Sequence, residues 1–180
     1  VYKRQKEEFA KDIDKNTFPG AQGGALNNQI AAKAVCFKEA LTKEYQDYSH
    51  QILNNAKALA SSFQEQGLRV VSGGTENHLV LVDTRSVDEE LTGKEAGILL
   101  NEKGITLNRN SIPFDPRSPF VTSGIRMGTP AVTTCGMKDD ELTKVGYLIS
   151  EILKNRLDEN RLSELEEQVR ALAKSFQPYG

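Results

Sequence analysis

Apolar residues recur at helical spacing over a long stretch that contains neither glycine nor proline. Residues 25–66 lack both residue types, and Gly67 follows them as a helix stop would. Steps of four and three between the apolar positions place them on one face of a helix. These positions are Leu26, Ile30, Ala34, Phe37, Leu41, Tyr45, Tyr48, Ile52, Ala56, Leu59 and Phe63. The pattern predicts a single helix over 25–66.

The length of this helix conflicts with the size of the chain. At 1.5 Å per residue it would be roughly 60 Å long. A compact domain of 180 residues has a radius of gyration of about 16 Å, so a diameter of roughly 40 Å. The helix therefore either breaks near Glu44 or Asp47 or links to a part of the protein outside this domain. No turn signal in the stretch favours a break.

The rest of the pattern alternates between short β-rich runs and helical periods. A glycine-rich loop precedes the long helix, and Ser72–Thr75 is a strong turn signal between two β-rich runs. Thr92 is expected to cap a helix, and Thr129-Pro130 is expected to start one. The predicted strands are 68–71, 78–83, 105–107 and 124–128, and the predicted helices are 6–14, 92–103, 138–155 and 160–176. We expect a small α+β domain over 67–180.

Composition and charge exclude several classes of protein. Lysine plus arginine total 23 and aspartate plus glutamate total 25, so the net charge of −2 argues against a nucleic-acid binder. No apolar run approaches the length of a membrane span. Cys36 and Cys135 lack CxxC spacing, which disfavours disulfide and zinc frameworks and indicates a reducing compartment, hence the cytoplasm. His50 and His78 have no partner at a catalytic or metal-binding spacing, so we expect no metal site.

The first five residues have the character of a cloning scar. Residues 1–5 read VYKRQ, which is what the end of a transposon sequence used in DNA library preparation encodes. We therefore expect 1–5 to be a sequencing artefact and the remaining chain to be a piece of a longer protein. The alternative is a genuine, exposed basic start.

Two glycine-bearing segments are candidates for binding an anion. The loop 19–24 leads into a helix N-terminus, where backbone N–H groups suit a phosphate or carboxylate, although such a loop is more often a tight turn. Arg126 lies on a predicted strand between Gly124 and Gly128, which would let a ligand approach the backbone closely. Its planar guanidinium suits a small carboxylate, but a surface arginine with a packed stem fits the spacing equally well.

The loop 108–123 is the third candidate. It is long, polar and holds three of the six prolines, and long loops in compact domains are often functional. Phe114 and Phe120 either pack on a flat ligand or pin the loop to the core, which is the commoner outcome.

Together these segments closely resemble the serine hydroxymethyltransferase (glycine hydroxymethyltransferase) family. The resemblance runs in family order over residues 6 to about 176, and its last segment is highly specific. The matching segments are FPGAQGG (18–24), AKAV (32–35), SGGTENHL (72–79), LTGKEA (91–96), NRNS (108–111) and DPRSPFVTSGIRMGTPA (115–131). It corresponds to the C-terminal part of a complete member, less than half of it.

The resemblance implies an α/β fold of the pyridoxal-phosphate fold-type-I transferase family. In such enzymes a large domain carries the cofactor on a lysine, a long helix links it to a small C-terminal α+β domain, and active sites form between two subunits. Residues 6–24 would then end the large domain, 25–66 would be the linking helix and 67–180 the small domain. The full-length protein is expected to be a homodimer or homotetramer.

The resemblance also implies a reaction and roles for particular residues. Serine plus tetrahydrofolate would be interconverted with glycine plus 5,10-methylenetetrahydrofolate, through an imine between the amino acid and pyridoxal 5'-phosphate. Arg126 would bind the substrate carboxylate. Gly23 and Gly24 would approach the cofactor phosphate of the neighbouring subunit. Folate contacts would come from Asn110, Ser118, Pro119 and Phe120, with Arg109 adjoining them.

The family's cofactor lysine has no counterpart in these 180 residues. None of the lysines lies in the threonine-rich context of that lysine, and the family's cofactor-stacking histidine, pyridine-nitrogen aspartate and proton-transfer glutamate are also missing. We therefore expect the 180-residue chain to be inactive by itself. Two alternatives stay open: a stand-alone domain that acts as a binding or oligomerisation module, and a fold-type-I relative with another reaction such as threonine aldolysis.

Overall fold

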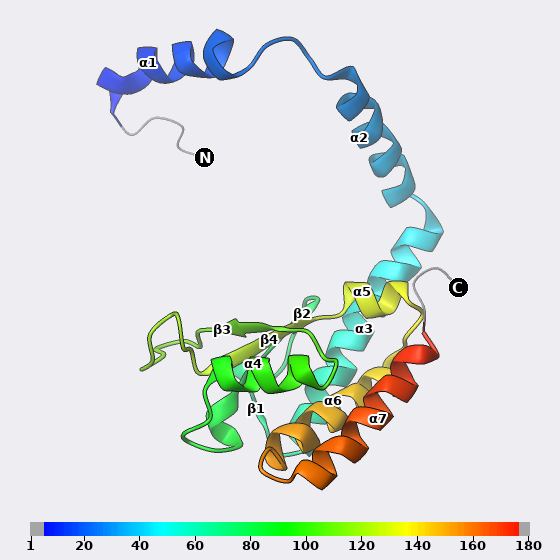
Figure 1. Ribbon diagram of the computed structural model, residues 1–180. Coiled ribbons are helices and arrows are strands. Elements are labelled where there is room, and N and C mark those ends of the chain that lie inside the picture. The colour runs from blue at the N-terminus through cyan, green and yellow to red at the C-terminus, as the bar shows by residue number, and fades with distance from the viewer. Residues whose placement is uncertain (1–5, 177–180) are drawn as a thin grey trace. The chain divides into compact units, whose positions relative to one another are not determined.

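The chain divides into two compact units, Val1–Lys43 and Glu44–Gly180, whose boundary lies inside the stretch predicted to be one helix. The computed structural model, shown in Figure 1, describes residues 6–176. The predicted scar at 1–5 lies outside the described residues. Within 6–176, no helix combines the length and the apolar character that crossing a membrane requires.

The first unit consists of helical segments with little burial. Its elements are η1 (Glu7–Phe9), α1 (Ala10–Lys15), the π-helical segment η2 (Asn16–Ala21) and α2 (Asn27–Ala40). Ala10 is buried, whereas the large apolar side chains are exposed. The exposed set is Phe9, Ile13, Phe18, Leu26, Ile30, Val35, Phe37 and Leu41.

The predicted helix over 25–66 is wrong as a single element, because it is interrupted at Leu41 and Thr42. The helix α2 ends at Ala40, and α3 spans Lys43–Glu65. The backbone N–H of Thr42 bonds to the carbonyl of Glu39, three residues back, at 3.0 Å, and the Thr42 hydroxyl donates to the same oxygen at 2.8 Å. This tightened turn replaces the regular four-residue helical bonding. The break lies two residues before the predicted alternative at Glu44.

The second unit contains a four-stranded antiparallel sheet in the order β1-β2-β4-β3. The strands are β1 (Arg69–Val70), β2 (Leu79–Asp83), β3 (Asn108–Asn110) and β4 (Gly124–Gly128). The predicted strand at 124–128 is confirmed, and 78–83 is confirmed to within one residue. The prediction of a strand at 105–107 is wrong: the Ile105 N–H closes the end of the preceding helix by bonding to the Leu100 carbonyl at 2.8 Å.

Helices cover this sheet, and of the two helix starts that the sequence predicts, one has the expected side-chain cap. They are α4 (Gly93–Glu102), α5 (Pro130–Thr134), α6 (Asp139–Lys154) and α7 (Glu159–Lys174), with short turns η3 (Val71–Gly73) and η4 (Thr84–Ser86). Thr92 caps α4 in a reciprocal pair with Glu95. Thr129 does not cap α5 with its side chain; its hydroxyl donates to the Ile52 carbonyl at 2.8 Å.

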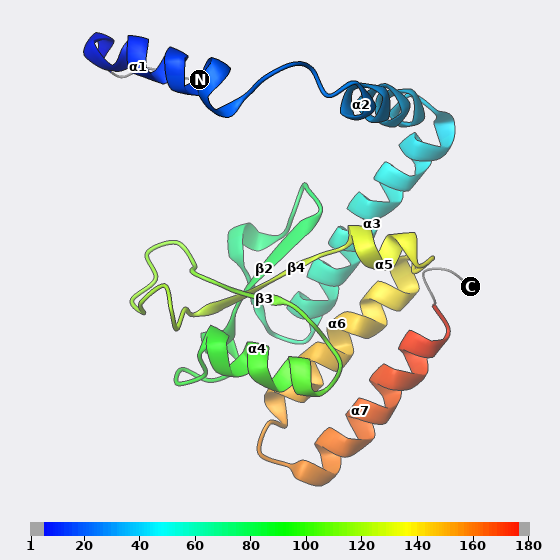
Figure 2. The same cartoon turned by 45° about the horizontal axis from the view of Figure 1, so that its top comes forward.

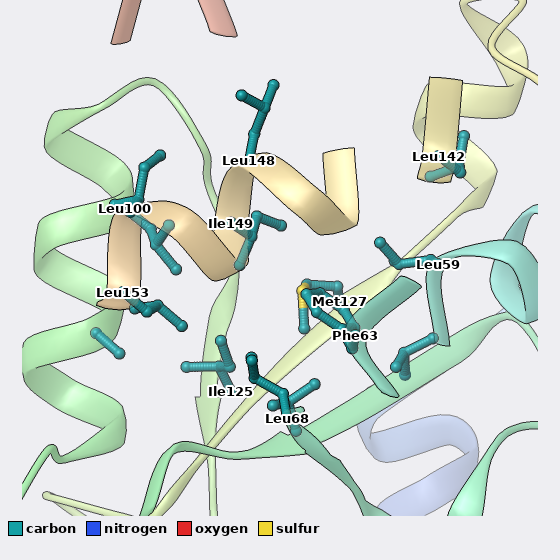
Figure 3. Packing of buried hydrophobic residues seen from close by; sticks show 14 of the residues in the cluster. Leu59, Phe63, Leu68, Leu100, Ile125, Met127, Leu142, Leu148, Ile149 and Leu153 are labelled. Carbon is teal, nitrogen blue, oxygen red and sulfur yellow. The ribbon is translucent and has the colours of Figure 1, made fainter. Parts of the chain in front are cut away.

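The hydrophobic core lies between the sheet and the helices α3, α4, α6 and α7. Figures 1 and 2 show α6 lying between α3 and α7, and Figure 3 shows the close packing of Phe63, Ile125, Met127 and Ile149. The helix α3 contributes Ala56, Leu59, Ala60 and Phe63 to this core. The compact unit therefore begins well before Gly67, the boundary that the sequence predicts.

Two phenylalanines of the same helical stripe should contribute very differently to stability. Phe63 is fully buried, whereas Phe37 is 66% exposed. We expect Phe63→Ala to lower the free energy of unfolding by about 3–5 kcal/mol, because it leaves a cavity in the core. The control Phe37→Ala should change it by less than about 0.5 kcal/mol. Urea unfolding followed by circular dichroism measures both, and equal losses would contradict this assignment of the core.

Candidate functional site

The two faces of β4 separate the core from a polar surface. Side chains alternate along a strand, so Ile125 and Met127 enter the core while Arg126 points to the opposite face. Directly paired residues share a face, and Arg126 stands opposite Leu81 of β2 and Asn108 of β3. The guanidinium is thus carried by an inner strand of the sheet, flanked on both sides.

Arg126 lines an open cavity of about 910 Å³. Helix α3 forms one wall and the turn that joins β1 to β2 forms another. The lining residues are Lys57, Ala60, Ser61 and Gln64 of α3, residues 71–77 of the turn, Leu79 and Leu81 of β2, and Arg126 itself. The cavity is built entirely from the second unit and falls within the size range of small-molecule sites.

Within residues 6–176 the Arg126 guanidinium makes no hydrogen bond or ion pair. Among residues 6–176, every arginine except Arg109 and Arg126 makes a hydrogen bond or ion pair with its side chain. The arginines Arg69 and Arg85, by contrast, both donate hydrogen bonds to the carboxylate of Asp83, at 2.7–3.1 Å. Burial acts to raise the pKa of Asp83, but the bonds from Arg85 and Arg69 lower it below its ordinary value. This carboxylate is therefore committed to other arginines, and Arg126 stays available for an external anion.

The glycines on either side of Arg126 serve the sheet rather than a ligand. A Cβ at Gly124 would lie 2.8 Å from the Asn110 carbonyl oxygen and 2.8 Å from Cγ2 of Ile112, and one at Gly128 would lie 3.2 Å from Cδ2 of Leu79. The sequence prediction that these glycines let a ligand approach the backbone is wrong, because neighbouring protein atoms already fill that space.

Strand β3 places the predicted folate-contact residue Asn110 on the same face as Arg126. Asn110 pairs with Gly124, two residues from Arg126. Its amide Nδ2 donates to the Ser111 carbonyl at 2.7 Å, which leaves Oδ1 as an acceptor. Arg109 pairs with Ile125 and lines a separate cavity of about 340 Å³ beside α4.

The loop after β3 is organised around one carboxylate. Asp115 accepts hydrogen bonds from the Ile112 N–H at 3.2 Å, the Arg117 N–H at 3.0 Å, the Ser123 N–H at 2.9 Å and the Ser123 hydroxyl at 2.7 Å. Burial acts to raise the pKa of Asp115, but these four hydrogen bonds outweigh it and lower the pKa to about 2. Both ends of the loop are thereby tied to one charged group.

Arg117 and Thr122 fasten the same loop to the start of α4. The Arg117 guanidinium donates to the carbonyl of Leu91 at 2.9 Å and to that of Glu89 at 2.6 Å. Thr122 holds a positive φ of 61°, which is strained for a β-branched residue, and its carbonyl accepts from the Gly93 N–H at 3.0 Å. The loop leads directly into β4, so its anchoring also fixes the strand that carries Arg126.

The remaining predicted site residues are exposed. Ser118, Pro119 and Phe120 lie on the outer part of the loop, with the Phe120 side chain 78% exposed. The expectation that such aromatic rings usually pin a loop to the core is therefore wrong for Phe120 and also for Phe114. Gly23 and Gly24 lie in an exposed segment of the first unit, and a Cβ at either position would meet nothing within 4 Å.

Sequence reasoning missed the α3 wall of the cavity and the role of Asp115. Lys57, Ser61 and Gln64 recur at steps of four and three, the spacing that places them on one helical face. That second, polar stripe was the available signal for the wall. Asp115 precedes a proline in a turn-rich segment, which marks a loop but does not show which N–H groups its carboxylate binds. Within 6–176, no cluster of three histidine, cysteine, aspartate or glutamate side chains is arranged to hold a metal ion.

The Asp115 carboxylate should control the order of its loop. We expect Asp115→Asn to speed hydrogen exchange at the Ile112, Arg117 and Ser123 amides by about tenfold or more, because an amide retains one acceptor oxygen where the carboxylate had two. The control Glu167→Gln removes a carboxylate from α7 and should leave these amides unchanged.

The same anchor predicts a pH dependence. The folded-state pKa of Asp115 lies below its ordinary value of 3.8. The stabilisation that the ionised carboxylate provides is therefore fully present above pH 3.8 and is lost as the pH falls towards about 2. Exchange at these amides, corrected for the intrinsic rate, should therefore rise over that window in the native protein. A flat profile would contradict the role of Asp115.

Comparison with known protein families assigns this chain. The family model described as serine hydroxymethyltransferase matches residues 1–149. The matched range includes the loop 17–26, the whole sheet, the cavity with Arg126 and the Asp115 loop. The family is associated with serine–glycine interconversion and one-carbon metabolism. The chain belongs to the serine hydroxymethyltransferase family.

Proposed function

We propose that this chain forms the substrate-carboxylate part of a serine hydroxymethyltransferase that interconverts serine plus tetrahydrofolate with glycine plus 5,10-methylenetetrahydrofolate. The observation that carries the proposal is Arg126, whose guanidinium lies on an inner strand, opens to a cavity and has no partner within residues 6–176. A planar fork of N–H donors binds a carboxylate with two parallel hydrogen bonds. Held in this way, serine has its bond between the α- and β-carbons fixed in direction for cleavage.

The backbone at residues 23 and 24 is suited to the phosphate group of pyridoxal 5'-phosphate. Neither backbone N–H of Gly23 or Gly24 donates a hydrogen bond within the described residues, and no side chain crowds either position. Two free N–H groups suit an oxygen of a phosphate, and we propose that they bind the cofactor phosphate of a neighbouring subunit in a homodimer or homotetramer. When bound, the cofactor supplies an electron sink for the amino acid.

The folate site is proposed at the start and the tip of the Asp115 loop. The Asn110 Oδ1 has no partner within 6–176 and can accept a hydrogen bond from a pterin N–H. The exposed Phe120 ring offers a flat apolar face to a flat heterocycle. The architecture proposed for the complete enzyme is the pyridoxal-phosphate fold type I, with a cytoplasmic location in keeping with its two free cysteines, Cys36 and Cys135.

Arg126 should govern the binding of a small carboxylate to this chain. We expect acetate to shift the amide signals of β4 in NMR titrations, and Arg126→Gln to abolish the saturable shift. Arg126→Lys should retain only part of the affinity, because an ammonium cannot make the bidentate contact. The control is Arg109→Gln, which removes the other guanidinium that, within the described residues, has no partner and should leave the titration unchanged. Acetate binding that persists in Arg126→Gln would overturn the proposal.

The 180-residue chain should not catalyse the reaction by itself, because we propose that the lysine that carries the cofactor is supplied elsewhere in the complete enzyme. We expect no glycine above the protein-free background when the purified chain is given serine, tetrahydrofolate and pyridoxal 5'-phosphate. A complete member of the family in the same assay is the positive control. Clear turnover that rises in proportion to the concentration of the chain would contradict this expectation.

A further inference from the structure

The cavity that holds Arg126 contains a second cation, Lys57. It is exposed on α3 and lines the same cavity as Arg126. Within residues 6–176 its ammonium makes no hydrogen bond or ion pair. Lys57, Ser61 and Gln64 form the polar stripe of α3, while Ala56 and Phe63 turn towards the core. The helix therefore presents Lys57 to the cavity because its other face is fixed by packing.

The charges and the volume of the cavity exceed what one carboxylate needs. Its charged lining residues are Lys57, Arg126 and Glu76, so the formal sum of two positive charges and one negative charge is +1. A single carboxylate on Arg126 would neutralise that sum but leave Lys57 without a direct partner. A volume of about 910 Å³ lies near the upper end of the range for small-molecule sites, which leaves space for a longer ligand.

Several polar side chains of the turn already bond within the protein, and Lys57 is the second positive charge in the lining of the cavity. The Thr75 hydroxyl donates to the Leu79 carbonyl at 2.6 Å, and Asn77 Oδ1 accepts from the Leu79 N–H at 2.8 Å. Gln64 Nε2 donates to the Gly73 carbonyl at 3.2 Å. Among the lining residues, Lys57 is therefore the positive charge besides Arg126 with which a second anionic group can pair.

We propose that Lys57 forms a second anion subsite, so that this cavity binds dicarboxylates, with one carboxylate on Arg126 and the other on Lys57. The proposal rests on the proposed function of Arg126 as a carboxylate-binding residue and adds a ligand class to it. The negative charge of Glu76, which also lines the cavity, repels the second carboxylate and limits the gain in affinity. Since Lys57 is solvent-exposed, the added ion pair should strengthen binding about three- to fivefold and should weaken with salt.

The test is an NMR titration of the 180-residue chain with acetate, malonate, succinate and glutarate, at matched ionic strength. The series varies the distance between the two carboxylates, and the amides of β4 report occupancy. After division by two for the two equivalent ends of a dicarboxylate, we expect at least one of them to bind about three- to fivefold more tightly than acetate. Raising the salt concentration should reduce this ratio.

Variants that each remove one charge distinguish a specific ion pair between Lys57 and the second carboxylate from general electrostatic attraction by the cavity. Lys57→Gln should bring the affinity for the preferred dicarboxylate down to that for acetate, and Glu76→Gln should raise it. The control Lys144→Gln removes a positive charge from the exposed face of α6 and should leave the ratio unchanged. Amide spectra without ligand check that each variant is folded, which is expected because these side chains are exposed.

The outcomes separate this inference from the function on which it rests. If acetate binds through Arg126 but no dicarboxylate exceeds it, or if the preference survives Lys57→Gln, the second subsite is overturned and the role of Arg126 stands. If Arg126→Gln leaves acetate binding intact, the proposed function fails. Binding of a dicarboxylate that needs both Lys57 and Arg126 supports both.

Discussion

The alternation of side chains along β4 is the constraint on which the second unit depends. Ile125 and Met127 can enter the core only if Arg126 points the other way, because successive residues of a strand face opposite sides. The same five-residue strand therefore holds the sheet to α6 and α3 and displays a guanidinium on its other face. Any change of register by one residue would bury the charge and expose the two apolar side chains.

The residues on the neighbouring strands leave that guanidinium without a partner in the part of the chain that the structure describes. On the same face of the sheet, Asp83 lies opposite Arg69 and also binds Arg85 through both of its oxygens. Leu81 and Asn108, the direct neighbours of Arg126, carry no charge. A sheet that contained a free carboxylate at either position would neutralise Arg126 internally. The positive charge of Arg126 is thus not neutralised by a neighbouring strand and is available to a ligand.

Local signals in the sequence predicted most of the elements, because the interactions that create those elements are themselves local. The Thr92 cap, the strand at 124–128 and the last two helices follow from residues close together in the chain. The errors arose where contacts between segments far apart in the sequence determine the secondary structure. Asn108–Asn110 is a strand because it pairs with β4, despite its polar residues, whereas apolar Ile105 closes a helix end. The break at Leu41 and Thr42 has no glycine or proline to mark it.

The candidate site was predictable in its central residue but not in its surroundings. The resemblance pointed to Arg126, Asn110 and Phe120, and the structure places Asn110 and Arg126 on one sheet face. Lys57 is 69 positions away from Arg126 in the sequence, and no local pattern links them. The prediction of a close approach at Gly124 and Gly128 was correct, but the atoms that approach them belong to neighbouring residues of the protein and not to a ligand.

The loop from 111 to 123 is held by the burial of Ile112, Thr122 and Ser123 at its two ends and by hydrogen bonds to backbone groups, whereas the side chains at its tip are exposed. Asp115 accepts three of its four hydrogen bonds from backbone N–H groups, and Arg117 donates to two backbone carbonyls beyond the loop. The side chains at the tip, Phe114, Ser118 and Phe120, are exposed and do not hold the loop in place. Evolution or an engineer can exchange them to change what the loop recognises, while its path remains the same.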